Sequence, residues 1–206
     1  MKIITISREF GSGGREIGKR LADVLGFDYY DKEIITQIAQ NKKMDENYIE
    51  NMLENQGWRT IPLNFRTSFS GLSMQSLQVE MLLEQRNVIE EIAKAGKNCV
   101  IVGRSADEIL EDCNPLNIFI CADLESKIKR SIERAPEGEN LSEKEIRRKM
   151  RQVDKNRART REIISGSPWG NRGTYHLTVN TSSWHIKELT NAIADFAESF
   201  FNRTKV

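Results

Sequence analysis

The sequence predicts an α/β fold in which helices cover both faces of a mostly parallel sheet of five strands. Short runs of β-branched residues alternate along the chain with longer stretches in which apolar residues have helical spacing. This alternation is typical of a parallel sheet with helices packed on it. The 206 residues suit one domain, or one domain with a mobile insert.

The first two elements are expected on either side of a glycine-rich turn. Residues 2–7 (KIITIS) are apolar and β-branched, as a buried strand requires. Residues 14–25 have a helical pattern, because apolar residues at Ile17 and four, seven and eight positions further on share one face. Gly26 follows at the position where a left-handed residue commonly ends a helix.

The second strand is expected over residues 27–30, and Asp31 can cap a helix that reaches about residue 41. Residues 42–75 are largely polar and irregular, with one short helical pattern. They form either a floppy surface excursion or a mobile substrate flap. The later elements are a long helix over 75–95, strands over 99–102 and 117–121, a helix over 123–134, a helix from about 143, a strand over 174–179 and a helix over 184–201.

Composition narrows the class of protein. Hydrophobic residues make up 38% of the chain and charged residues 30%, and the formal net charge is only +1. A near-neutral chain has no bulk attraction to nucleic-acid polymers or membrane surfaces. No apolar run is long enough to span a bilayer, and the start of the chain lacks a signal-peptide pattern. The three widely spaced cysteines favour reduced thiols, so we expect a cytoplasmic protein.

The positive charge is concentrated in one segment. Between residues 124 and 161, thirteen Lys and Arg accompany seven Asp and Glu, although the whole chain is nearly neutral. A local basic segment suits a small anionic ligand better than a long polyanion, which usually needs a broader basic face.

The turn EFGSGGRE, between the first strand and the first helix, is a candidate phosphate-binding loop. Such a loop needs glycines that let backbone N–H groups turn inward, and a helix N-terminus that favours negative charge. In the pattern G-x-x-x-x-G-K-[ST], placing the last glycine on Gly14 puts Glu9 at the first glycine, Arg15 at the lysine and Glu16 at the hydroxyl. The strict spelling therefore fails three times, and a plain tight turn is the alternative.

Five blocks of the sequence together resemble the cytidylate kinase-like family, a branch of the nucleoside monophosphate kinases. The blocks are ITISREFGSGG, FDYYDKEII, VIVGRSADEIL, VDKNRARTREI and WGNRGTYHLTVNTS. The resemblance implies a three-layer P-loop kinase fold spanning residues 1–206. It also implies a helical monophosphate-binding insert over 42–75 and a basic lid over 134–165. Cytidylate kinases use ATP and Mg²⁺ to phosphorylate CMP or dCMP.

On the donor side, the resemblance implies that the loop backbone cradles the ATP phosphates through Gly11, Ser12, Gly13 and Gly14. Arg15 would contact the β- and γ-phosphates in place of the usual lysine, although its guanidinium is bulkier and forked. Glu16 has no hydroxyl to offer. Its carboxylate could ligate Mg²⁺, or it could simply be an acidic residue that the helix dipole favours.

On the acceptor side, cytidylate kinases carry Asp-Gly-Arg after the third strand, where this chain has Val102-Gly103-Arg104. The resemblance implies that Arg104 grips the acceptor phosphate, whereas the acid that helps to organise Mg²⁺ is missing. Asp31 matches an acceptor-site position, or it only caps its helix. Arg130 and Arg134 either bind substrate or oppose the dipole of the helix that they end.

The basic lid contains two arginines at positions that continue an apolar face. This face starts at Ile146, and helical spacing extends it to Arg157 and Arg161. A guanidinium on such a face needs a counter-charge, because an unpaired buried charge is costly. The partner is either a carboxylate such as Asp154 or a phosphate. The resemblance implies the second, with Arg157 and Arg161 stabilising the transferred phosphoryl group.

The sequence therefore predicts an ATP-dependent kinase that acts on CMP, dCMP or another small acceptor. Catalysis would rest on positioning and charge stabilisation. Because both residues that usually organise Mg²⁺ are replaced, the alternative is a non-catalytic nucleotide-binding or sensor protein with a degenerate P-loop. RNA binding through the arginine-rich helices is a more distant alternative.

Overall fold

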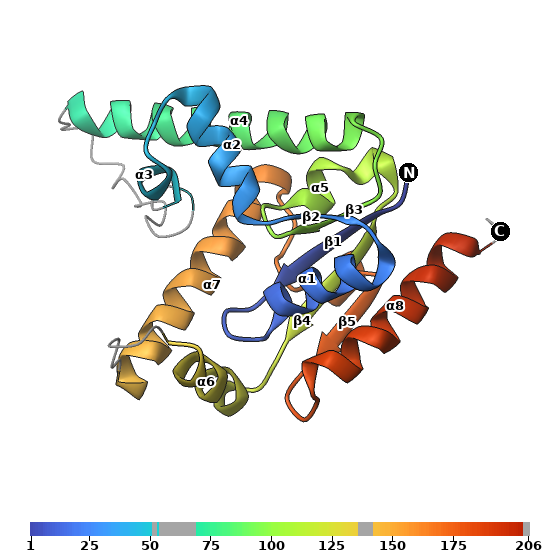
Figure 1. Cartoon of the computed structure of the whole chain (residues 1–206). Coiled ribbons are helices and arrows are strands. Elements are labelled where there is room, and N and C mark those ends of the chain that lie inside the picture. Colours follow the sequence, from blue (N-terminus) through green and yellow to red (C-terminus); the bar gives the residue numbers. More distant parts are fainter. Residues whose placement is uncertain (51–52, 54–68, 136–141, 204–206) are drawn as a thin grey trace.

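The computed structural model describes residues 1–50, 53, 69–135 and 142–203, and Figure 1 shows their arrangement. In this part of the chain, five parallel strands form one sheet in the order β2-β3-β1-β4-β5. The strands are β1 (Ile3–Arg8), β2 (Asp28–Tyr30), β3 (Cys99–Val102), β4 (Leu116–Cys121) and β5 (Leu177–Asn180). The predicted five-stranded parallel sheet is confirmed.

The central strand β1 is buried along its whole length. It pairs with β3 on one side and with β4 on the other, and helices cover both faces of the sheet. A strand that is buried on both faces has no need for alternating polar residues. This explains the nearly continuous apolar run at the start of the chain.

Two hydrophobic clusters cover the two faces of the sheet. On one face, α1 (Gly14–Leu25) packs beside α8 (Ile186–Asn202). On the other face lie α2 (Lys32–Lys42), α3 (Glu46–Glu50), α4 (Phe69–Lys94) and α5 (Ala106–Ile109). These three layers are the architecture that the alternating pattern predicts.

Two further helices lie near the turn between β1 and α1 (Figure 1). They are α6 (Leu124–Glu133), which Asp123 caps, and α7 (Glu143–Ser165), which begins with a capping box formed by Ser142 and Glu145. Two short 3₁₀ turns, Glu111–Cys113 and Arg172–Thr174, complete the described elements. Within the described residues, the helices are too short or too polar to cross a membrane.

Two expected elements have different bounds in the structure. The long helix α4 begins at Phe69 rather than at residue 75. Its first six residues, FSGLSM, include a glycine and two serines, which are weaker helix formers than alanine or leucine, and this hid the helical pattern. The last strand begins at Leu177 rather than at residue 174. There, the side chain of Asn171 accepts a hydrogen bond from the N–H of Gly173 and stabilises a 3₁₀ turn that extended backbone cannot form.

A buried ion cluster fixes the end of α7 to α5. The side chain of Arg161 is only 2% exposed and forms ion pairs with both Asp107 and Glu108. Its Nε donates to the hydroxyl of Ser167 at 3.0 Å, and its guanidinium lies over the ring of Tyr175. Burial raises the pKa of Asp107, and Arg161 opposes this shift. Arg161 therefore offsets part of the cost of burying the carboxylate, and its ion pairs hold two distant segments together.

We expect Arg161→Ala to lower the free energy of unfolding by about 3–5 kcal/mol, because it leaves a buried carboxylate without its counter-charge. Urea unfolding followed by circular dichroism measures the change. Arg148→Ala, at an exposed position of the same helix, is the control and should change stability by less than about 0.5 kcal/mol. A loss below about 1 kcal/mol for Arg161→Ala would show that the cluster does not anchor α7.

Candidate active site

The turn between β1 and α1 has the backbone of an anion-binding loop. Gly11 and Gly13 both have positive φ, 74° and 86°, which favours glycine. Gly13 is also the left-handed N-cap of α1 and provides no side-chain cap. The first N–H groups of an α-helix lack partners within the helix, and the helix dipole adds positive potential there. The loop therefore presents backbone donors suited to a phosphate.

Packing makes the same glycines necessary. A Cβ atom at Gly11 would lie 2.9 Å from the carbonyl oxygen of Lys127, and one at Gly13 would lie 2.8 Å from Cδ1 of Ile186. A Cβ atom at Gly14 would lie 2.5 Å from Cβ of Arg8. Real Cβ atoms do not approach other atoms so closely. At Gly11 and Gly14 the contacted atoms belong to or adjoin the backbone and cannot move aside, whereas at Gly13 the positive φ is the stronger requirement for glycine.

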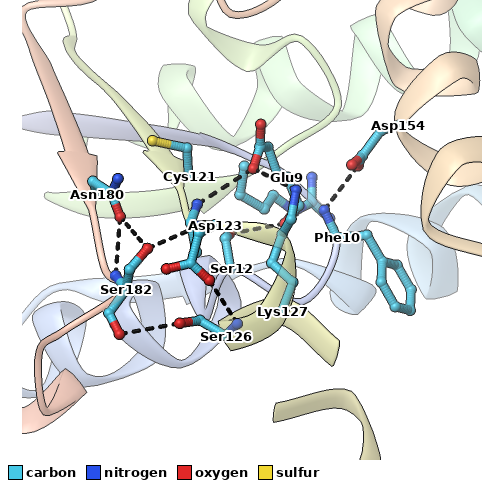
Figure 2. Close-up of polar contacts among 12 residues, drawn as sticks. Glu9, Phe10, Ser12, Cys121, Asp123, Ser126, Lys127, Asp154, Asn180 and Ser182 are labelled. Atoms are coloured by element: carbon cyan, nitrogen blue, oxygen red, sulfur yellow. Dashed lines mark hydrogen bonds and ion pairs between the residues drawn. The ribbon is translucent and has the colours of Figure 1, made fainter. Parts of the chain in front are cut away.

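Hydrogen bonds and ion pairs attach the loop to α6 and α7 (Figure 2). The N–H of Phe10 donates to Oδ1 of Asp154 at 2.8 Å. The carboxylate of Glu9 pairs with Nζ of Lys127 at 2.9 Å. The hydroxyl of Ser12 donates to the carbonyl of Glu9 at 2.8 Å. Because Asp154 belongs to α7, the basic helix is in direct contact with the glycine loop.

Arg130 and Thr181 hold the other side of the loop. Arg130 donates from Nη1 to the hydroxyl of Thr181 at 2.8 Å and to the carbonyl of Ser12 at 3.3 Å. The hydroxyl of Thr181 also donates to the carbonyl of Ser12, at 2.7 Å. Sequence reasoning missed Thr181, although a polar residue directly after a parallel strand lies at the edge where ligands usually bind. Arg130 therefore supports the glycine loop.

Glu16 is neutralised by two arginines. Its carboxylate pairs with Nε of Arg20 at 2.8 Å and also with Arg134. Burial raises the pKa of Glu16, but hydrogen bonds and charge attraction from Arg20 and Arg134 outweigh it, so the pKa lies below its usual value. Glu16 is thus ionised at neutral pH and already paired. Arg134, which was expected to bind substrate, contacts the first turn of α1.

The described side chains do not fit a protein-held magnesium site at this loop. Among residues 1–50, 53, 69–135 and 142–203, no group of three or more His, Cys, Asp and Glu could hold a metal ion. Val102 stands where an acid would help, and the carboxylate of Glu16 is taken by two guanidinium groups. Mg²⁺ usually binds one or two free carboxylates together with phosphate oxygens.

Asp31 is a buried carboxylate that two arginines share. Its side chain is 3% exposed and pairs with Arg15, in part through Nη2 at 3.4 Å. It also lies 3.8 Å from Nη2 of Arg8. Asp31 occupies the N-cap position of α2 but makes no side-chain cap hydrogen bond. The expectation that its side chain caps the helix is therefore wrong, because the two guanidinium groups compete successfully for the carboxylate.

A pocket adjoins the loop at the ends of β1 and β3. Arg8, Arg104 and Arg157 enter it from β1, from the turn after β3 and from α7. Arg157 also donates from Nη1 to the carbonyl of Arg8 at 3.0 Å and pairs with Asp154 at 3.3 Å. The other lining residues are Ser7, Leu53, Gln85, Gly103, Ser105, Val153, Asn156, Thr160 and Trp169.

The structure thus separates the arginines that were expected to act together. Arg104 and Arg157 line one pocket. Arg161 does not line it, because its guanidinium forms ion pairs with Asp107 and Glu108. Arg15 lies outside the pocket, on the exposed side of α1. Arg8 was missed by sequence reasoning. The sequence feature that could have identified it is a charged residue at the end of a buried strand, directly before the glycine turn.

Solved structures with the same fold include three informative neighbours. An uncharacterized protein from Eubacterium ventriosum is 28% identical, with a TM-score of 0.71 and coverage of 97% of this chain and 99% of that chain. The shikimate kinase from Acinetobacter baumannii, solved in complex with shikimate, is 15% identical, with a TM-score of 0.56 and coverage of 98% and 96%. A sugar kinase from Janibacter is 12% identical, with a TM-score of 0.54 and coverage of 96% and 95%.

These neighbours show the P-loop kinase fold that the resemblance implied. No protein with a curated description matches the chain. Residues 3–183 match the sequence model of the cytidylate kinase-like family. This range covers the five strands, the glycine loop and the arginine-bearing helix α7. This chain therefore belongs to the cytidylate kinase-like family.

Proposed function

We propose that this protein transfers the γ-phosphate of ATP to CMP, dCMP or another small acceptor. One observation carries the proposal: the anion-binding loop adjoins a pocket that contains Arg104 and Arg157, and Arg157 is hydrogen-bonded to the last residue before the loop. A donor phosphate on the loop and an anionic acceptor in the pocket would then lie side by side. Such positioning is the main requirement for phosphoryl transfer.

The lining of the pocket favours an acceptor that is itself a phosphate. Among the described lining residues there are three arginines and no Asp, Glu or His. A hydroxyl acceptor loses a proton on transfer, which a general base usually accepts. A phosphate oxygen attacks as an anion and needs no base. It forms a bond to the γ-phosphorus while the bond to the bridging oxygen breaks, and ADP leaves with that electron pair.

In this mechanism the chain contributes backbone donors and guanidinium groups. The loop amides from Gly11 to Glu16 would hold the donor phosphates, and Arg130 would keep the loop in shape through the carbonyl of Ser12. Arg104 would bind the acceptor phosphate, and Arg157 would stabilise the phosphoryl group in transit. Mg²⁺ bound to ATP would add charge neutralisation, but we assign no step to a metal held by the protein.

The acceptor insert and the lid complete the proposal. We assign acceptor binding to residues 42–75, although residues 51–52 and 54–68 lie outside the described part of the chain. We assign the lid to residues 134–165, of which 136–141 are also outside it. The second candidate function is a nucleotide sensor without turnover. In the register with the last glycine on Gly14, Glu16 takes the position of the usual hydroxyl, and its already paired carboxylate favours this alternative.

We expect ATP with Mg²⁺ to raise the melting temperature of the protein and one nucleoside monophosphate to trigger ADP release. Thermal shift with a panel that includes CMP and dCMP, followed by a coupled ADP assay, measures both effects. Shikimate and a neutral sugar are the comparison acceptors. Stabilisation without turnover on any acceptor would favour the sensor, and no stabilisation by any nucleotide would contradict a phosphate-binding loop.

We expect Arg157→Ala to lower kcat by about 10²–10³-fold, because it removes a charge from the transferred phosphoryl group. Its melting temperature should fall by only a few degrees. Arg151→Ala is the matched control, since Arg151 is an exposed arginine of the same helix, and its kcat should be unchanged. A large loss of stability with unchanged kcat would make Arg157 a purely structural residue.

A further inference from the structure

Arg8 and Gly14 occupy adjoining positions that cannot both carry a side chain. A Cβ atom at Gly14 would lie 2.5 Å from Cβ of Arg8 and 3.1 Å from its Cγ. The contacted atoms are at the start of the Arg8 side chain, next to the backbone of β1, so they cannot move aside without moving the strand. One of the two positions must therefore be glycine when the other is not.

The phosphate-loop pattern resolves the same conflict in the opposite way. The pattern has glycine at its first position and lysine at its seventh. Gly13 needs positive φ and directly precedes α1, so it suits the sixth position, the glycine before the lysine. The first position then falls on Arg8 and the seventh on Gly14, one residue earlier than in the register expected from the sequence, which put Glu9 and Arg15 at these positions. The chain has arginine at the first position, where the pattern has glycine, and glycine at the seventh, where the pattern has lysine. The basic side chain has thus moved from one of two contacting positions to the other.

The guanidinium of Arg8 extends from this point toward the proposed transfer site. A Cβ atom at Gly103 would overlap Nη1 of Arg8, so Gly103 leaves the space that the guanidinium fills. The side chain of Arg8 is 8% exposed and lines the pocket together with Arg104 and Arg157. The group thus lies beside Gly103, and both residues line the acceptor pocket.

Arg15 has a different environment. Its side chain is 52% exposed, pairs with Asp31 and does not line the pocket. Oδ1 of Asp31 also lies 3.8 Å from Nη2 of Arg8. Asp31 thus contacts the guanidinium groups of both Arg8 and Arg15.

We propose that Arg8, rather than Arg15, supplies the cation that contacts the transferred phosphoryl group. The proposal rests on the proposed function and names a catalytic residue for it. As the acceptor oxygen bonds to the γ-phosphorus and ADP leaves with the electron pair of the broken bond, Arg8 donates hydrogen bonds to the oxygens of the group in transit. Gly14 and Gly103 provide the room, and Asp31 is a positioning residue.

The first experiment compares Arg8→Gln and Arg8→Lys with Arg15→Gln. Isothermal titration calorimetry measures the affinity of each variant for ATP and for ADP, and this readout does not need turnover. Because Arg8 contacts the γ-phosphate, Arg8→Gln should lose the preference of the wild type for ATP over ADP by about tenfold or more. Arg8→Lys should retain part of it, and Arg15→Gln should retain most of it. Circular dichroism melting selects variants that are folded.

The second experiment restores the order of the pattern. Arg8→Gly should lower kcat by about 10²–10³-fold, as removal of a transition-state donor does in other enzymes. The double variant Arg8→Gly with Gly14→Lys should recover at least tenfold of that loss. Glycine at residue 8 removes the atoms that a side chain at residue 14 would overlap, so the lysine can extend toward the phosphates. Gly14→Lys alone, with Arg8 still present, should be strongly destabilised by the overlap.

The outcomes separate the two proposals. An unchanged ATP preference in folded Arg8→Gln and Arg8→Lys, or a larger loss in Arg15→Gln, overturns the role of Arg8 and leaves the kinase proposal standing. If Arg8→Gln loses the preference for ATP over ADP but the wild type phosphorylates no acceptor, the contact of Arg8 with the γ-phosphate is supported and the kinase proposal is overturned. A wild type that binds neither ATP nor ADP overturns both.

Discussion

All described strands run in the same direction, and the candidate site depends on this constraint. The residues that follow β1, β3 and β5 therefore meet at one edge of the sheet, where helix N-termini also point. There, the glycine loop packs against α8 through Ile186 and against α6 through Lys127. Close packing leaves little room for side chains here. The glycines of the loop therefore permit its positive φ angles and also its close contact with the neighbouring segments.

Two carboxylates, those of Asp31 and Asp154, contact several of the cationic and N–H groups at this edge. Asp31 is shared by two arginines, and Oδ1 of Asp154 accepts from both the N–H of Phe10 and Nη1 of Arg157. The pocket itself is lined by arginines without an acidic lining residue among those described. By contrast, Arg161 has two carboxylates to itself. Arginine thus forms a buried ion cluster at the end of α7, whereas in the pocket it lines a surface that could bind an anion.

The fold was largely predictable because its signals are local. Apolar runs, helical spacing and the glycine after Leu25 depend on neighbours in the chain, and they placed most of the elements correctly. The site was predictable only in outline. Helical spacing showed that Arg157 and Arg161 continue an apolar face, but it did not show what faces them. Arg161 meets Asp107, 54 positions earlier in the chain, and no spacing rule links these residues.

The sequence by itself determined the order of strands and helices, the position of the glycine turn between β1 and α1, and the membership in a kinase-like family. The elements and the turn follow from backbone preference and burial, which each segment carries in its own composition, whereas the family follows from the resemblance of whole sequence blocks. Only the tertiary structure decided which arginine enters which environment. Arg8 passes over Gly14 and Gly103, and Arg15 turns to Asp31, because steric overlap and charge pairing arise between segments that only folding brings together.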